Sequence, residues 1–166
     1  MQDNADFRLM ELLCPLNLPP YPFRITEHDG QFFLFDEIRK KTLLITPEEW
    51  VRQHFIQYLV VQKKYPKTLI QLEGGLKLNG MAKRTDILVY NSSTEKLLLV
   101  ECKAPSVKIT QKVFDQIARY NIIHRVPLLA VTNGLQHFYC RIDLEEKKYF
   151  FLDNLPDYEQ LAKYFL

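Results

Sequence analysis

The sequence predicts a single α/β domain over residues 1–166, with a mixed β-sheet flanked by helices. Apolar runs of strand length alternate with polar turns, as in a sheet. Two stretches with apolar residues at helical spacing lie before and after a group of three such runs. With 47% hydrophobic and 25% charged residues, the chain can bury a core. A helix, a three-stranded meander, a crossover helix and a return strand therefore predict an α/β sandwich with core order α-β-β-β-α-β.

Residues 1–45 are predicted to form an N-terminal extension that contains a small hairpin. Residues 1–30 are expected to be irregular, because four prolines interrupt regular structure there: Pro15, Pro19, Pro20 and Pro22. The apolar runs at 31–35 and 41–45 read as two strands around a turn at 36–40.

Residue 46 opens the predicted core, which extends over 46–152. Thr46 is a helix N-cap, Pro47 suits the first helical position, and Glu49 lies three residues after the cap in a capping-box arrangement. The helix should end near Lys64, since Tyr65 precedes a proline. Its apolar face is Trp50, Val51, Phe55, Tyr58 and Leu59.

Strands are expected at 68–73, 84–90 and 96–103. A further short strand follows Gly74 and Gly75, and Asn79-Gly80 is a tight-turn signal because both residues tolerate positive φ. The two later runs are joined by a short polar break at 91–94, which predicts a β-hairpin.

The second half of the core has one helix and three strands. Pro127 ends the amphipathic helix predicted at 109–125. The strands that follow are expected at 127–132, 138–142 and 148–151. A short C-terminal helix, at about 157–165, lies within the last segment, 153–166.

Charge and hydropathy limit the partners and the location. The net charge of +2 does not by itself indicate nucleic-acid binding. DNA contact would need a local basic patch, and a solvated charged surface is an equal alternative for most of its members. No apolar run is long enough for a membrane span, and the polar N-terminus is no signal peptide, so we expect a cytoplasmic protein without a membrane partner. The candidate patch residues are Lys63, Lys64, Lys83, Arg84, Lys108, Lys112, Arg119 and Arg125.

Asp86 and the tripeptide Glu101-Cys102-Lys103 form the most informative motif. Side chains alternate along a strand, so Glu101 and Lys103 share a face and Cys102 points away into the core. Asp86 can reach the same face from the neighbouring strand. Two carboxylates and an ammonium on a buried sheet are costly unless they bind something, and a divalent cation would satisfy them. Alternatively, Asp86 caps a turn or pairs with Arg84, and Glu101 pairs with Lys103 structurally.

The segments 46–52, 84–87, 100–105 and 116–120 carry a resemblance that spans about 46–134. The pattern Asp-(x14)-Glu-x-Lys on hairpin strands, followed by a helix with Gln116 and Tyr120, resembles the PD-(D/E)xK nuclease superfamily. More narrowly, the chain resembles the N-terminal nuclease domain of type I restriction enzyme R subunits. The resemblance implies a restriction-endonuclease-like, single nuclease-like domain.

The resemblance also implies roles for the motif residues. Asp86 and Glu101 would hold Mg²⁺ or Mn²⁺, and the backbone carbonyl of Cys102 would complete the coordination. Lys103 would orient the attacking water or stabilise charge in the transition state.

The resemblance also suggests roles for Gln116, Tyr120 and Glu49, and the last two have a structural alternative. Gln116 and Tyr120 are spaced i, i+4 and share a helix face, from which they would point toward the phosphate or support the lysine. Tyr120 can equally be a core residue with a hydrogen-bonded hydroxyl. Glu49 matches a third acid that many superfamily members place near the metal, but it also fits the capping box.

These observations predict a metal-dependent DNA endonuclease of the restriction or DNA-processing type, which hydrolyses phosphodiester bonds. The chain has no Walker pattern, so we expect no ATPase motor of its own. Its expected partners are DNA and a separate motor or specificity protein. The alternatives are a non-catalytic nucleic-acid or protein-binding module on a nuclease fold, and a structural protein whose acids form surface ion pairs.

Overall fold

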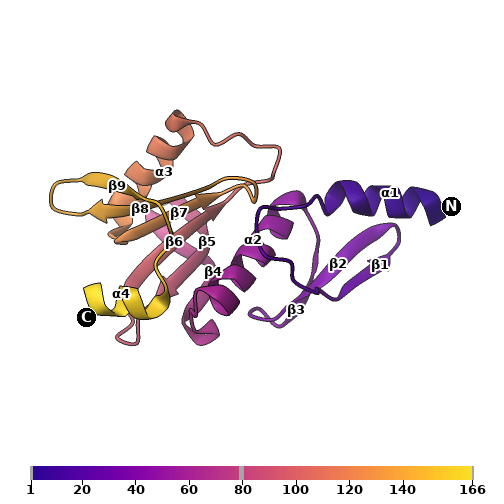
Figure 1. The fold of residues 1–166 in the computed structure, drawn as a ribbon, viewed down its shortest axis with the longest axis horizontal. Coiled ribbons are helices and arrows are strands. Elements are labelled where there is room, and N and C mark those ends of the chain that lie inside the picture. Colours follow the sequence, from indigo (N-terminus) through magenta and orange to yellow (C-terminus); the bar gives the residue numbers. More distant parts are fainter. Residues whose placement is uncertain (1, 79–80, 166) are drawn as a thin grey trace.

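The computed structural model describes the backbone of residues 2–78 and 81–165, and their side chains except at 2–6, 74–78, 81–84, 122–123, 162 and 164–165. The turn predicted at Asn79 and Gly80 lies outside the described residues. The chain forms a six-stranded sheet and a separate three-stranded sheet, and helix α2 (Pro47–Gln57) lies between them (Figure 1). No helix in the described part is long and apolar enough to cross a bilayer.

The core has the predicted order α-β-β-β-α-β. The six strands lie in sequence order across the sheet, and all neighbours are antiparallel except β6 and β7, so the predicted mixed sheet is confirmed. The elements after α2 are a π-helical turn (Tyr58–Gln62), a 3₁₀ turn (Lys67–Leu69), β4 (Ile70–Leu78), β5 (Met81–Tyr90), β6 (Lys96–Cys102), α3 (Gln111–His124), β7 (Leu128–Thr132), β8 (His137–Asp143), β9 (Lys148–Leu152) and α4 (Tyr158–Phe165).

Helices cover both faces of the six-stranded sheet because the side chains of its central strands alternate. Ile87, Val89, Leu98 and Val100 pack on one face with Val51 and Phe55 of α2 and with Leu161 of α4. Leu88 and Leu99 point to the other face, where Phe114 and Ile117 of α3 cover them. β7 is buried along its whole length, as expected for a central strand covered from both sides.

Helix α2 begins where its sequence predicts. Thr46 has an extended backbone, and its hydroxyl accepts a hydrogen bond of 3.0 Å from the Glu49 amide, while Pro47 occupies the first helical position. The π-helical turn continues α2 to Gln62, and the Lys63 amide donates to the Tyr58 carbonyl at 3.1 Å. The predicted end near Lys64 is therefore confirmed.

The N-terminal extension is more regular than the sequence indicated. The predicted hairpin is present as β2 (Gln31–Asp36) and β3 (Lys41–Leu44), but α1 (Gln2–Leu12) and β1 (Ile25–His28) make the prediction of an irregular 1–30 wrong. The four prolines lie only in the connection between α1 and β1. Both elements gain a partner, since β1 pairs with β2, and Leu9 and Leu12 of α1 pack against a cluster that includes Trp50 of α2.

The strands β5 and β6 part before Ile87 on β5 and after Val100 on β6, and this fork positions the candidate site. β5 pairs with β4 from Met81 to Thr85 and from Ile87 to Val89, but it pairs with β6 only from Ile87, which lies opposite Val100. Beyond Val100, β6 continues beside β7, with Glu101 opposite Val131. Asp86, one residue before Ile87, therefore lies at the point of divergence.

Candidate functional site

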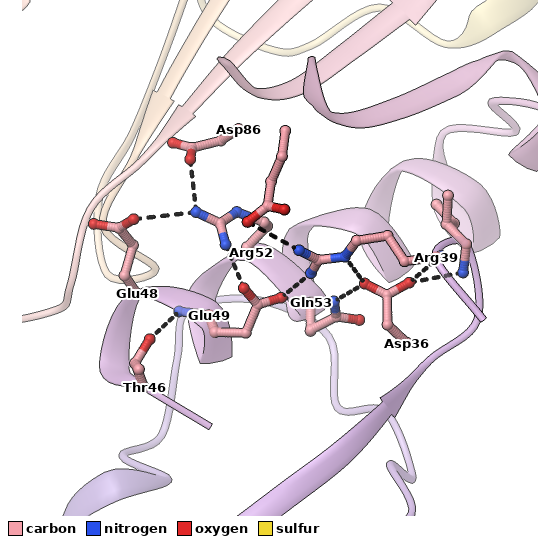
Figure 2. Close-up of polar contacts among 10 residues, drawn as sticks. Asp36, Arg39, Thr46, Glu48, Glu49, Arg52, Gln53 and Asp86 are labelled. Atoms are coloured by element: carbon pink, nitrogen blue, oxygen red, sulfur yellow. Dashed lines mark hydrogen bonds and ion pairs between the residues drawn. The ribbon is translucent and has the colours of Figure 1, made fainter. Parts of the chain in front are cut away.

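Asp86 bridges the fork between β5 and β6 with its side chain. Its Oδ2 accepts a hydrogen bond of 2.7 Å from the Cys102 amide, where the backbone ladder between the two strands has stopped. Its Oδ1 accepts from Nη2 of Arg52 in α2 at 2.6 Å (Figure 2). The side chain is 14% exposed, so the carboxylate is held in a defined position but remains reachable from solvent.

Glu101 and Lys103 flank Cys102, whose amide binds Asp86, at this end of β6. Lys103 Nζ donates to Glu101 Oε1 at 2.8 Å, and both side chains are partly buried. Burial alone would lower the pKa of Lys103, but the hydrogen bond to Glu101 and the charges of Glu101, Asp86 and Glu48 outweigh it and raise that pKa above its usual value. Lys103 is therefore a fixed positive charge at neutral pH, beside the two predicted metal ligands.

Cys102 faces away from the site, as the alternation predicts. Its side chain is fully buried and packs in the cluster that contains Val51 and Phe55. Burial raises the pKa of the thiol well above its ordinary value, so the sulfur is not a nucleophile. The backbone around it is held on both sides, because its amide binds Asp86 and the Lys103 amide donates to the Thr132 carbonyl at 2.8 Å.

Glu49 lies within a buried ion-pair network rather than facing Lys103. Its Oε1 accepts from Arg39 at 2.5 Å and from Gln53 at 2.8 Å, and its Oε2 pairs with Arg52. The side chain is 9% exposed. The Glu49 amide donates to the Thr46 hydroxyl, as the N-cap predicts. The carboxylate binds two arginines and Gln53 and, among the described contacts, not the Thr46 amide, so only half of the predicted capping box is seen.

Glu48, which the sequence reasoning did not select, is the acid of α2 that faces the site. Its carboxylate accepts from Arg52 Nη2 at 3.1 Å and is 45% exposed. Its charge contributes to the raised pKa values of both Lys103 and Cys102. The available signal was the i, i+4 spacing of Glu48 and Arg52, which by itself indicates only a surface ion pair.

Arg52 and Arg39 are the other residues that the sequence reasoning missed. Arg52 pairs with Glu48, Glu49 and Asp86, and Arg39 pairs with Asp36 at 2.7 Å, Glu49 at 2.5 Å and Glu73 at 3.2 Å. Carboxylates outnumber cations in this region by three, so its formal charge is negative. The described groups are Asp36, Glu48, Glu49, Glu73, Asp86 and Glu101 against Arg39, Arg52 and Lys103.

Helix α3 approaches the site through Tyr120. Burial and the charge of Glu101 raise the pKa of Tyr120, which places its hydroxyl within the field of that carboxylate. The ring packs edge-on against His124, with 4.4 Å between ring centroids. Gln116, one turn earlier on the same helix face, is exposed to solvent.

The candidate DNA-binding residues divide into three groups. Lys108, Lys112 and Arg119 are exposed, on the loop before α3 and on α3 itself. The side chains of Lys83 and Arg84 lie outside the described residues. The other candidates lie elsewhere: Lys63 pairs with Asp157 at 3.2 Å, Lys64 donates to the Val61 carbonyl, and Arg125 precedes β7 at its opposite end.

The donor set suits a hard divalent cation in type. Asp86 and Glu101 offer carboxylate oxygens, which Mg²⁺ and Mn²⁺ prefer, and Glu48 offers a third carboxylate across the fork. The negative excess of the region also favours an added cation. Within residues whose side chains are described, no three acidic, histidine or cysteine side chains are already gathered as ligands. The acids must therefore shift to coordinate an ion, and Asp86 Oδ1 must share or lose Arg52.

The fold defines a class of protein. A mixed sheet between helices, with the order α-β-β-β-α-β, is a restriction-endonuclease-like fold. The chain belongs to the family of type I restriction enzyme R protein N termini, whose model matches residues 47–156. This range includes Glu48, Arg52, Asp86, Glu101 and Lys103.

A solved structure and the curated proteins complete the comparison. A fragment described as an HsdR subunit of a type I restriction enzyme from Vibrio vulnificus YJ016 is similar at 24% identity and a TM-score of 0.37. The match covers 57% of this chain and 18% of that one, so the chain spans less than a fifth of the length of the structure it matches. No curated protein matches the chain.

Proposed function

We propose that the chain is a metal-dependent DNA endonuclease of a type I restriction system or a related DNA-processing system. The observation that carries the proposal is the convergence of Asp86, Glu101 and Lys103 at the fork between β5 and β6. Membership in the R protein N-terminus family supports a role connected with restriction. Its substrate would be the phosphodiester backbone of DNA, with a separate motor or specificity protein as a further partner.

Asp86, Glu101 and the Cys102 carbonyl would hold Mg²⁺ or Mn²⁺, with Glu48 rather than Glu49 as the additional acid. Glu48 is exposed and acts on Lys103, whereas both oxygens of Glu49 are occupied by Arg39, Arg52 and Gln53. A bound ion would supply positive charge at the scissile phosphate and lower the pKa of a bound water.

Lys103 would act as a permanent cation rather than as a general base. Because its pKa is raised, Nζ keeps its proton at neutral pH and can donate hydrogen bonds to a phosphate oxygen or to the attacking water. Positive charge at this position stabilises the negative charge that develops on the phosphate. Tyr120 would support the same region from α3, with Gln116 as a contact to the DNA backbone.

The exposed cations near α3 would bind the DNA backbone. Lys108, Lys112 and Arg119 are exposed and lie on or directly before the helix that carries Tyr120. Phosphate contacts from such residues position a duplex without reading its sequence. With a net charge of only +2, the chain would bind DNA weakly alone, and a partner would supply further affinity.

Cleavage of supercoiled plasmid DNA by the purified chain, with Mg²⁺ or Mn²⁺, tests the proposal. Lys103→Ala should lower the cleavage rate by roughly 100-fold or more, the cost of removing one donor to a transition-state charge. Lys148→Ala is a matched control, since Lys148 also pairs with the acid two residues earlier, Glu146, at 2.9 Å, but lies on β9. It should cleave at the rate of the unmodified protein. Undiminished cleavage by Lys103→Ala would exclude the proposed site.

A non-catalytic DNA-binding module on the same fold is the second candidate. It is favoured by the contact between Arg52 and Asp86, which occupies an oxygen that a metal ion would use. This candidate predicts DNA binding that depends on Lys112 and Arg119 and no cleavage with either metal. The plasmid assay and a binding titration on the same preparation separate the two functions.

A further inference from the structure

Arg52 occupies the space between the acids of α2 and the fork. A single atom, Nη2, lies 3.1 Å from Glu48 Oε1 and 2.6 Å from Asp86 Oδ1, so one N–H group points at each carboxylate (Figure 2). The other terminal nitrogen, Nη1, pairs with Glu49. The side chains of Arg52 and Asp86 are only 8% and 14% exposed, so water screens their contact weakly, whereas the contact with the half-exposed Glu48 is screened more.

We propose that Arg52 is a positioning residue that stands in for a cation between Glu48 and Asp86, so that a divalent metal ion binds only after displacing Nη2. The inference rests on the proposed function, because it concerns the same metal site. It explains how acids on α2, β5 and β6 can remain close together without an ion. Carboxylates that bind the same nitrogen atom of one arginine would repel each other in a partly buried site if no cation lay between them.

The contacts of Nη2 belong to the metal-free state. An ion that takes oxygens of Glu48 and Asp86 removes or weakens the hydrogen bonds that those oxygens accept from Arg52. An interaction present in one state only shifts the equilibrium toward that state, so these contacts oppose metal binding. The positive charge of Arg52 also repels a nearby divalent ion.

The remaining contacts of Arg52 allow such a displacement. Nη1 can keep its pairing with Glu49, which Arg39 and Gln53 hold from the other side. Arg52 Nε has no hydrogen-bond partner in the part of the chain that the structure describes, although it is buried. If Nη2 loses its contacts, Nη1 therefore still anchors the guanidinium to Glu49.

Arg39 provides a matched comparison for Arg52. It is equally buried, at 11% exposure, and it also pairs with three carboxylates, Asp36, Glu49 and Glu73. Among the residues whose side chains are described, its ion pairs involve neither Glu48 nor Asp86. Removing Arg39 therefore removes a buried arginine from the same network without removing a charge from between the proposed ligands.

Titration of the purified chain with Mn²⁺ alone, by calorimetry, tests the inference without any nuclease readout. Arg52→Gln should bind Mn²⁺ about tenfold or more tightly than the unmodified chain, because a competing positive charge and its hydrogen bonds are gone. Mn²⁺ should also raise the melting temperature of Arg52→Gln more than that of the unmodified chain. Arg39→Gln should lose thermal stability but keep its Mn²⁺ affinity within about twofold.

An equal or weaker Mn²⁺ affinity of Arg52→Gln overturns the inference, and so does the absence of Mn²⁺ binding in every variant. Asp86→Asn in the Arg52→Gln background should abolish the gain, and a gain that survives would place the ion elsewhere and also overturn it. If circular dichroism shows that Arg52→Gln does not fold, the Mn²⁺ titration of Arg52→Lys tests the inference instead. A lysine has one nitrogen in place of Nη1 and Nη2, so it cannot place one nitrogen on Glu49 and another between Glu48 and Asp86, and the Mn²⁺ affinity of this variant should still exceed that of the unmodified chain.

The outcomes separate this inference from the proposed function. Tighter Mn²⁺ binding by Arg52→Gln without plasmid cleavage supports the role of Arg52 and contradicts the nuclease. Cleavage that depends on Lys103, together with unchanged Mn²⁺ affinity in Arg52→Gln, supports the nuclease and overturns the role of Arg52.

Discussion

Neutralising each of the two adjacent glutamates at the start of α2 should affect a different property of the protein. Glu49 is committed to the buried network, and Glu48 faces Lys103 and the fork. Glu49→Gln and Glu48→Gln make the same chemical change one residue apart, so each variant is the control for the other. The first should mainly lose stability, and the second should mainly lose metal affinity.

The structure gives the size of the two stability effects. Glu49 is 9% exposed and binds Arg39 at 2.5 Å, Gln53 at 2.8 Å and Arg52. Removing one partner of a buried ion pair costs about 3–5 kcal/mol. For a domain of this size that corresponds to a melting temperature lower by roughly 10 °C. Glu48 is 45% exposed and has one contact of 3.1 Å, and an exposed pair of this kind contributes about 1 kcal/mol or less.

Thermal unfolding followed by circular dichroism in metal-free buffer measures the first effect, and Mn²⁺ titration measures the second. Glu48→Gln should bind Mn²⁺ roughly tenfold more weakly, since one carboxylate ligand becomes a neutral amide. Equal melting temperatures of the two variants would refute the assignment of Glu49 to the network. Loss of Mn²⁺ affinity in Glu49→Gln without loss of stability would show that Glu49, and not Glu48, is the metal ligand.

Two further predictions follow from buried and exposed charges. Burial would raise the pKa of Asp36, but hydrogen bonds and the charge of Arg39, together with a hydrogen bond from Gln53, outweigh it and lower that pKa. The stability that Asp36 contributes to the fold is therefore fully present above the unfolded pKa of about 4 and is lost as the pH falls through the lower folded pKa. Asp36→Asn should therefore be destabilised at pH 7 by an amount that shrinks below about pH 4 in urea unfolding, and a constant difference would contradict this. Lys112→Ala and Arg119→Ala should each reduce the salt dependence of DNA binding by about one unit of slope, whereas an unchanged slope would exclude a phosphate contact.

The core of the fold was predictable because its signals are local. The Thr46 N-cap, the polar break between two apolar runs and the amphipathic helix after them each depend on residues close together in the sequence. The convergence of Asp86, Glu101 and Lys103 was predictable for a related reason. Hairpin strands bring residues on either side of a turn together, and strand alternation decides which of them share a face.

The partners of these acids were not predictable, because they come from distant parts of the chain. Arg52 reaches Asp86 across 34 residues, and no periodicity relates the two. The helix α1 and the strand β1 were missed because the prolines between them suggested an irregular segment. Their stability depends on tertiary contacts with β2 and with Trp50, which overrode the weak local signals.

The buried network makes the N-terminal extension part of the candidate site. Asp36, at the end of β2, is fully buried and binds Arg39, which binds Glu49, which in turn pairs with Arg52 and through it with Asp86 (Figure 2). Charges of alternating sign thus run from the extension to the fork. Each of these charges would be costly to bury alone. Removing one of them therefore leaves its partner buried without compensation and destabilises the network. The stability of α2 beside the fork therefore depends on the turn between β2 and β3 as well as on the six-stranded sheet, which agrees with the expectation that Arg39→Gln loses stability and keeps its Mn²⁺ affinity.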